Sequence, residues 1–158
     1  MALLALKGVS KSFGALKVTD DVSLSVTQGE VLGILGPNGA GKTTLFNLIS
    51  GDLQVDAGAV EFDGRLITSA PPFQRCRDGI GRSYQVPQPF GAMSVFENLV
   101  TAACFGAQVT EKKAWEIGWD VLQQTGLQRF ANTPAGSLFL HSSWSMNLAS
   151  LISPFCSM

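Results

Sequence analysis

The alternation of apolar and polar residues in the first half of the chain predicts antiparallel strands. Within residues 18–27 the two kinds of side chain take turns, as they do on a strand with one buried face. A tight turn is predicted at Asp63-Gly64, which lies between two further apolar runs. The strands predicted from these patterns are residues 3–10, 18–27, 59–62 and 66–68.

Apolar residues at helical spacing predict helices between and after these strands. Ser94, followed three residues later by Glu97, predicts a capping box. Thr110 and Gly126 are typical of the start and the end of another helix. The predicted helices are residues 42–50, a short helix from Pro72 to Cys76, and residues 95–105 and 111–124.

Two segments predict strands of a more buried kind. Residues 31–35, Val-Leu-Gly-Ile-Leu, are apolar and rich in branched side chains, which favours a strand buried in a parallel sheet. Residues 80–85 predict another strand that ends at Gln85. Directly after residues 31–35, residues 36–44 read Gly-Pro-Asn-Gly-Ala-Gly-Lys-Thr-Thr and fit the phosphate-binding P-loop pattern. Strand, glycine loop and helix is the context that this motif requires.

The residue types of this loop predict nucleotide binding. Its glycines permit turns that let successive amides point at phosphate oxygens, and the following helix adds the positive end of its dipole. Lys42 would reach the β- and γ-phosphates, Thr43 would offer its hydroxyl to Mg²⁺, and Thr44 would bond the α-phosphate. The predicted ATP-binding residues of the loop are Gly36, Asn38, Gly39, Ala40, Gly41, Lys42, Thr43 and Thr44.

Composition narrows the classes of partner. A chain of 158 residues is most simply one domain, and a net charge of −1 implies no nucleic-acid partner. No run approaches the roughly 18 apolar residues of a membrane span, so direct membrane insertion is not expected. The cysteines, Cys76, Cys104 and Cys156, share no metal-ligand spacing and are predicted to be reduced packing residues.

The last twenty residues differ in style from the rest. None of the 12 acidic and 11 basic residues lies within residues 139–158. One interpretation is an apolar segment that packs on the body. We favour another, that the reading frame is lost near Leu138 and that this aberrant tail was never selected for the fold. His141, the only histidine, is predicted to be a bystander.

Several motifs together resemble the ATP-binding subunit of an ABC transporter. The likeness runs from about Leu3 to Leu138 and is greatest to the subunits of branched-chain amino acid importers. The motifs that carry it are the P-loop, Lys11-Ser12-Phe13-Gly14, Gly81-Arg82-Ser83-Tyr84-Gln85 and Met93-Ser94-Val95-Phe96-Glu97-Asn98-Leu99.

The resemblance implies a fold and the roles of some residues. The fold class is α/β: a P-loop NTPase core of the ABC type over residues 1–138, with an N-terminal antiparallel β subdomain and a partial helical subdomain, incomplete at the C-terminus. ATP and Mg²⁺ are the implied cofactors. Phe13 matches the aromatic residue that stacks on adenine, with a core phenylalanine as the alternative. Lys42 and Gln85 match catalytic residues, and Gln85 would contact Mg²⁺ together with Thr43.

The resemblance also implies partners. These are transmembrane permease subunits and a second ATP-binding subunit, with the chain cytoplasmic and peripheral on the inner face of the plasma membrane. Residues 86–96 match the surface that meets a coupling helix of the membrane subunit. Phe90 and Phe96 are apolar contacts there or, equally, core residues.

Departures from the family pattern limit what this chain is expected to do alone. After Leu138 no signature phrase, no strand ending in Asp-Glu and no switch histidine follows. We therefore expect little ATP turnover, and poor solubility because apolar edges stay open. A non-catalytic remnant of a damaged gene is an alternative. Another P-loop kinase or GTPase, with Arg75, Arg77 and Arg82 as candidate lid arginines, is a further one.

Overall fold

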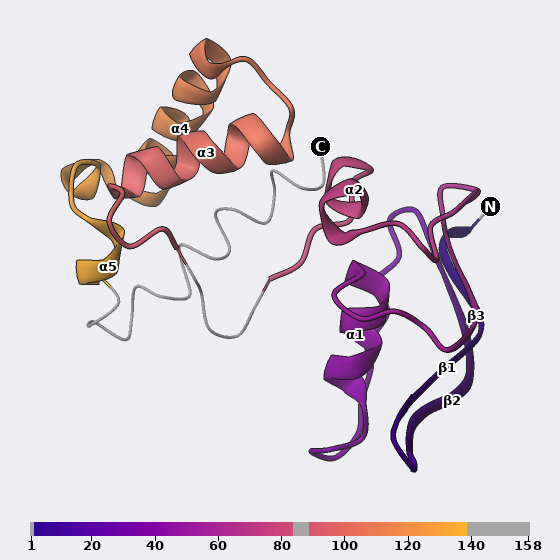
Figure 1. Ribbon diagram of the computed structural model, residues 1–158. Coiled ribbons are helices and arrows are strands. Elements are labelled where there is room, and N and C mark those ends of the chain that lie inside the picture. Colours follow the sequence, from indigo (N-terminus) through magenta and orange to yellow (C-terminus); the bar gives the residue numbers. More distant parts are fainter. Residues whose placement is uncertain (1, 84–88, 139–158) are drawn as a thin grey trace. The chain divides into compact units, whose positions relative to one another are not determined.

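The computed structural model of the protein describes residues 2–83 and 89–138. The chain divides into two compact units, Met1–Arg75 and Cys76–Met158. The first unit contains a sheet and the helix that follows the P-loop, and the second is built from helices (Figure 1).

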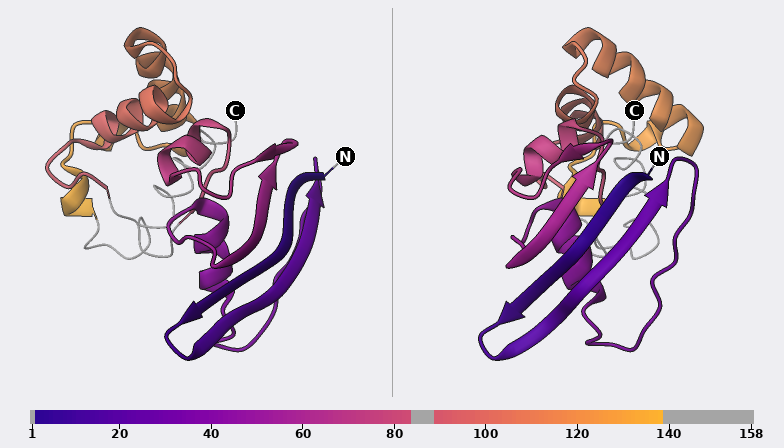
Figure 2. Two further views of the ribbon diagram at one scale, coloured as in Figure 1. Left: turned by 45° about the vertical axis from the view of Figure 1, so that its right-hand side comes forward. Right: turned by 90° about the vertical axis from the view of Figure 1, so that its right-hand side faces the viewer.

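The sheet of the first unit is antiparallel throughout, with strand order β2-β1-β3-β4. All four predicted strands are present, but β1, β2 and β3 are longer than the sequence pattern indicated, and β4 ends at Leu66 instead of continuing to Thr68. Strands β1 and β2 form a long hairpin that closes at Gly14 and Ala15 (Figure 2). The strands are β1 (Ala2–Phe13), β2 (Leu16–Thr27), β3 (Ala57–Phe62) and β4 (Arg65–Leu66).

A very close approach of two backbones joins β3 to β1. Gly58 has a φ of +89°, and a Cβ atom added there would lie 2.3 Å from the carbonyl oxygen of Gly8. Only glycine has both the conformation and the space that this contact requires.

Helix α1 (Lys42–Ser50) covers one face of the sheet (Figures 1 and 2). Its bounds match the predicted helix over residues 42–50, it buries Leu45 and Leu48, and Gly51 directly after it has a φ of +84°. Leu6, Val9 and Val60 of the sheet are also buried, so the first unit has a core between sheet and helix. The short helix α2 (Pro72–Arg77) begins at Pro72 as predicted and ends one residue later than predicted.

Two predicted strands are wrong within the described residues. Residues 31–35 belong to no strand, and Val31 and Leu35 are 95% and 96% exposed. Residues 80–83 also form no strand, and the rest of that prediction lies outside the described residues. A strand needs a neighbour to bond its amides and carbonyls. No parallel neighbour exists in residues 2–83 and 89–138, so these apolar runs stay unpaired.

The second unit consists of α3 (Val95–Gly106), α4 (Glu111–Thr125), η1 (Gln128–Phe130) and α5 (Ala135–Leu138). The capping box of α3 is confirmed, because the Glu97 amide donates to Ser94 Oγ at 3.2 Å and the Ser94 amide to Glu97 Oε2 at 2.7 Å. Thr110 and Gly126 flank α4 as predicted, although Thr110 makes no side-chain capping bond.

Helices α3 and α4 pack against each other. Gly118 of α4 leaves room for the ring of Phe96, which a Cβ there would approach to 3.2 Å. That ring meets Trp115 and Trp119 edge-on, at centroid distances of 4.9 and 6.1 Å. The main buried cluster is Val95, Leu99, Leu122, Leu127 and Ala131. Among the described residues, no helix is both long enough and apolar enough to span a membrane.

Candidate nucleotide-binding site

The P-loop has the backbone conformation that its glycines were predicted to supply. Gly39 and Gly41 have φ values of +83° and +80°, a region that strongly favours glycine. A Cβ on Gly41 would lie 2.8 Å from the carbonyl oxygen of Val18, so the end of the loop is pressed against β2. At Gly36 a Cβ would lie 3.3 Å from that of Ala40, across the loop.

The loop turns directly into α1. The Ala40 amide donates to the Pro37 carbonyl at 3.2 Å, and the first helical bond joins the Leu45 amide to the Gly41 carbonyl at 2.9 Å. No side chain of the described residues caps this end of α1. The amides of the first turn, together with the positive end of the helix dipole, are therefore available to an anion.

The Lys42 side chain folds back across the loop. Its ammonium donates to the carbonyl oxygens of Gly36 and Pro37 at 2.7 and 2.6 Å. The positive charge is thus held between the loop backbone and the start of α1, beside the uncapped amides. A phosphate chain entering the loop would replace one or both carbonyls as the partner of this ammonium.

The remaining predicted loop residues are placed for contact with a ligand from solution. Thr43 is exposed in the first turn of α1, and Thr44 beside it is half-buried. Gly36, Asn38, Gly39 and Ala40 are exposed as well. All eight predicted loop residues belong to one short segment of the chain, and the backbone of this segment turns at residues 39–41.

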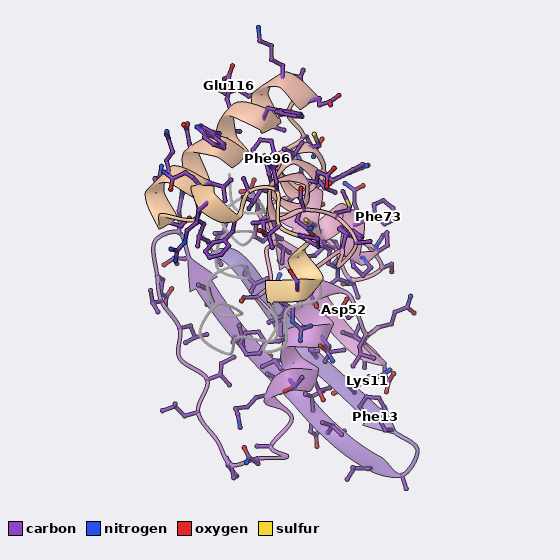
Figure 3. All side chains as sticks on the ribbon, turned by 90° about the vertical axis from the view of Figure 1, so that its left-hand side faces the viewer. Lys11, Phe13, Asp52, Phe73, Phe96 and Glu116 are labelled. Carbon is purple, nitrogen blue, oxygen red and sulfur yellow. The ribbon has the colours of Figure 1, made fainter. Side chains whose placement is uncertain are left out.

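Phe13 lies at the end of the β1–β2 hairpin and is 48% exposed, so it is no core residue. The Lys11 ammonium lies 5.8 Å from the centroid of its ring (Figure 3). Lys11 also pairs with Asp56 at 2.6 Å, and the second oxygen of that carboxylate accepts from the Ser12 amide at 2.8 Å. These bonds lower the pKa of Asp56, the Lys11 ammonium more than the Ser12 amide. The strand end that carries the ring is thereby fixed.

The strand register places the backbone of Phe13 near the point where the P-loop meets β2. Phe13 pairs with Leu16 across the hairpin, and Ser12 pairs with Lys17. The next residue along β2, Val18, is the one that Gly41 touches. Phe13 is paired with Leu16 of β2, and Gly41 at the end of the P-loop approaches Val18 of β2. The two contact points on β2 are therefore two residues apart.

The other predicted site residues are less fully placed. Gln85 lies outside the described residues. Phe90 is 61% exposed, whereas Phe96 is half-buried against the two tryptophans of α4. Of the two aromatics predicted to meet a partner, only Phe90 presents most of its ring to solvent.

Two features near these residues escaped the sequence interpretation. Asn98 is only 3% exposed, and its side chain holds the loop before α3 by bonding both the amide and the carbonyl of Phe90 at 2.9 and 3.1 Å. An amide inside the apolar run Val95–Val100 was the available signal. Arg75, considered as a lid arginine, is 1% exposed and bonds backbone carbonyls, so that interpretation is wrong.

Comparison with known proteins identifies the class. The sequence pattern described as ABC transporter matches residues 19–148, most of the chain, and the chain belongs to that family. A solved ATP-binding cassette of an ABC transporter is 30% identical, with a TM-score of 0.79 over 99% of this chain and 66% of that one. A solved ATP-binding cassette of an ABC transporter in its ADP conformation is 31% identical, with a TM-score of 0.77 over 99% of this chain and 65% of that one. The α/β fold class and the ATP-binding class are confirmed.

Particular relatives point to two kinds of transporter. A probable branched-chain amino acid transport ATP-binding protein LivG of Archaeoglobus fulgidus is 43% identical over 65% of this chain and 40% of that protein. LivG of Methanocaldococcus jannaschii is 45% identical over 63% and 39%. The lipopolysaccharide export system ATP-binding protein LptB of Escherichia coli is 43% identical over 87% and 57%. The matches therefore span about two fifths to three fifths of these relatives.

Proposed function

We propose that this chain is the nucleotide-binding part of the energising subunit of an ABC importer for branched-chain amino acids. The observation that carries the proposal is the P-loop with its lysine: turned at Gly39 and Gly41, open at the start of α1, with the Lys42 ammonium held across it. A triphosphate offers the oxygens that such a loop of amides and a cation would bind.

Each residue of the site has a distinct task in this proposal. The loop amides and Lys42 bind the β- and γ-phosphates, and Phe13 stacks on the adenine ring. Mg²⁺ usually takes few protein ligands and completes its shell with phosphate oxygens and water. The exposed Thr43 hydroxyl fits that role. Gln85, which lies outside the described residues, would also contact Mg²⁺ and would orient the attacking water. Lys42 would contribute its positive charge at the phosphates.

Calorimetric titration of the purified chain with Mg-ATP tests the nucleotide half of the proposal. We expect saturable binding that is lost in Lys42→Ala and weakened in Phe13→Ala, because one removes the cation and the other the stacking ring. Lys112→Ala is the matched control, since it removes an exposed lysine from α4 in the other unit. Equal binding by wild type and Lys42→Ala would contradict the proposal.

The transported class rests on the LivG likeness, with lipopolysaccharide export, named for LptB, as the competing class. In the proposal, permease subunits meet residues 86–96, and a second ATP-binding subunit faces the P-loop. The chain is then cytoplasmic and peripheral on the inner face of the plasma membrane. Within the described part of that surface, Phe90 is exposed and Asn98 fixes its backbone.

Co-purification with permease subunits separates these transporter classes. We expect the tagged chain to retain the permease subunits of a branched-chain amino acid importer, and Phe90→Ala to retain less. Phe105→Ala removes a comparably exposed ring, 70% against 61%, and is the control. Retention of lipopolysaccharide export permeases instead would move the proposal to that class.

A second candidate is a non-catalytic nucleotide-binding remnant of a damaged transporter gene. The uncharged composition of residues 139–158 favours it. Genomic DNA beyond the codon for Leu138 decides between the two. A signature phrase and an Asp-Glu strand in another frame would support a frameshift, and their absence from every frame would exclude one.

A further inference from the structure

Arg75, the fourth residue of α2, is the largest fully buried side chain among the described residues, with 1% of its surface exposed. A buried guanidinium requires hydrogen bonds to replace the water that it has lost. All of the bonds described for it are to backbone carbonyl oxygens of the first unit, and they connect two segments that are distant in sequence.

Two of these carbonyls belong to the last turn of α1. Nη1 of Arg75 donates to the carbonyl oxygens of Leu48 and Ile49 at 2.7 and 2.9 Å. Carbonyls at a helix C-terminus have no partner within the helix, and a cation there also meets the negative end of the dipole. The guanidinium therefore stabilises the end of α1 by hydrogen bonding and by charge.

The other two carbonyls lie in the segment between β4 and α2. Nη2 donates to Thr68 and Nε to Ala70, both at 2.9 Å. Burial lowers the pKa of Arg75, and the nearby Asp52 carboxylate raises it. The side chain remains charged at any ordinary pH, because a guanidinium does not deprotonate in proteins.

The surroundings are shaped for this side chain. A Cβ on Gly51, directly after α1, would lie 2.8 Å from Nε of Arg75. The planar fork of an arginine can bond several carbonyls at fixed angles, whereas a lysine places one compact ammonium. A lysine would keep the charge at the end of α1 but would not join both segments.

Helix α1 is thereby anchored at both ends. At its start Gly41 is pressed against Val18 of β2, and at its end Leu48 and Ile49 are bound by Arg75. A nine-residue helix is about 13 Å long and moves as a rigid rod, so a shift at one end changes the other. The P-loop amides and Lys42 are at the other end.

We propose that Arg75 is a positioning residue for nucleotide binding: by tying the end of α1 to the segment before α2, it sets the orientation of the P-loop. The inference rests on the proposed function for its effect on ATP. The anchoring of α1 is a separate property that is measured without a nucleotide.

The test compares Arg75→Met and Arg75→Lys with wild type. Arg65→Met is the matched control, because it removes an exposed arginine from β4. For each protein, Mg-ATP affinity is measured by calorimetry well below its unfolding midpoint. Deuterium exchange of the backbone amides of residues 36–50 is measured without nucleotide.

We expect Arg75→Met to bind Mg-ATP at least tenfold more weakly and to exchange residues 36–50 faster. Arg65→Met should match wild type in both measurements. Arg75→Lys should fall between, since it restores one charge and only part of the hydrogen bonding. If Arg75→Met does not fold, Arg75→Lys decides, with weaker binding and faster exchange than Arg65→Met as the supporting result.

A lower unfolding midpoint with unchanged affinity and exchange would overturn the inference, because Arg75 would then act on stability alone. If wild type and Arg65→Met bind no ATP, the proposed function fails. In that case the exchange of residues 36–50 still decides whether Arg75 positions the loop: faster exchange in the Arg75 variants supports it, and equal exchange overturns it.

Discussion

At the scale of single residues, the structure depends on a few positions where no other side chain fits. Gly41 and Gly58 combine a positive φ with contacts to a neighbouring carbonyl, while Arg75 bonds four carbonyls from a buried position. Gly41 directly precedes α1, the helix that follows the P-loop, and Arg75 bonds the end of that helix. The proposed nucleotide site is therefore built from backbone geometry as much as from side chains.

Replacement of Gly58 should destabilise the sheet strongly. Gly58→Ala combines a left-handed backbone with a Cβ 2.3 Å from the Gly8 carbonyl oxygen, and we expect a loss of about 3 kcal/mol in urea unfolding. Gly64→Ala is the control for strain alone. Its φ is +71° with open space around it, and about 1 kcal/mol is expected. Equal losses for the two variants would refute the close approach of β3 to β1.

Residue patterns predicted some of these features and missed others. The glycines of the P-loop were predictable because their spacing is itself the motif. Arg75 and Asn98 were not, because their partners are backbone carbonyls and amides that the fold brings together. The sequence shows an arginine in a short helix and an asparagine among apolar residues, but it does not show whether either side chain is buried or which groups it bonds.

At the scale of elements, helices with local start and stop signals were predicted best. The capping box of α3 joins residues three apart, and the glycines after α1 and α4 adopt positive φ by themselves. The strands predicted at residues 31–35 and 80–83 are absent, because strand formation depends on a neighbouring strand that the sequence pattern does not reveal. Apolar content indicates that a segment prefers burial, and it cannot supply the partner strand.

The capping box of α3 predicts a measurable effect on helix stability. Ser94→Ala removes the acceptor of the Glu97 amide, and we expect a loss of about 1 kcal/mol in unfolding followed by circular dichroism. Ser94→Asn, which keeps a side-chain acceptor at the N-cap, should lose only a few tenths of that. A loss as large in Ser94→Asn would show that the missing acceptor is not the cause.

The same cap predicts a pH dependence. The hydrogen bond from the Ser94 amide lowers the pKa of Glu97, and that from the Ser94 hydroxyl lowers it less. The resulting stability is present above the unfolded-state pKa of about 4.3 and is lost as pH falls through the lower folded-state value. Glu97→Gln keeps an acceptor without titrating, so its melting temperature should fall less than that of wild type between pH 6 and pH 3. Parallel curves would contradict this.

At the scale of the whole molecule, the described part of the chain contains a nucleotide loop without the strands that would flank it. The matched regions cover 39–57% of the relatives reported above, and Val31 and Leu35 are almost fully exposed. An exposed apolar run that belongs to no strand of the described residues favours self-association. We therefore expect poor solubility to arise from the exposed apolar run at residues 31–35.

Charges placed on this run should reduce aggregation. We expect Val31→Lys combined with Leu35→Lys to raise the soluble fraction after centrifugation without lowering the melting temperature, because neither side chain contributes to a core. Phe105→Lys is the control, since it places a lysine on an exposed apolar residue of the other unit, 70% exposed. If it improves solubility as much, the run at 31–35 is not the cause.

Turnover should be slow even where ATP binds. The resemblance to ABC subunits implies that residues after a signature phrase hold Mg²⁺ and polarise water, and we expect that the uncharged residues 139–158 do not supply them. We expect little phosphate release at saturating Mg-ATP, with Lys42→Ala as the background. Sustained release at the rate of a full-length LivG relative, absent in Lys42→Ala, would contradict this.

The central claim is that residues 36–44 bind a chain of phosphates, and an affinity series tests it most directly. Calorimetry with ATP, ADP, AMP and adenosine on the same preparation separates the contribution of phosphates from that of the base. The account predicts measurable binding of ATP and ADP and at least a hundredfold weaker binding of AMP and adenosine. Equal affinity for all four, or binding of none, would contradict it.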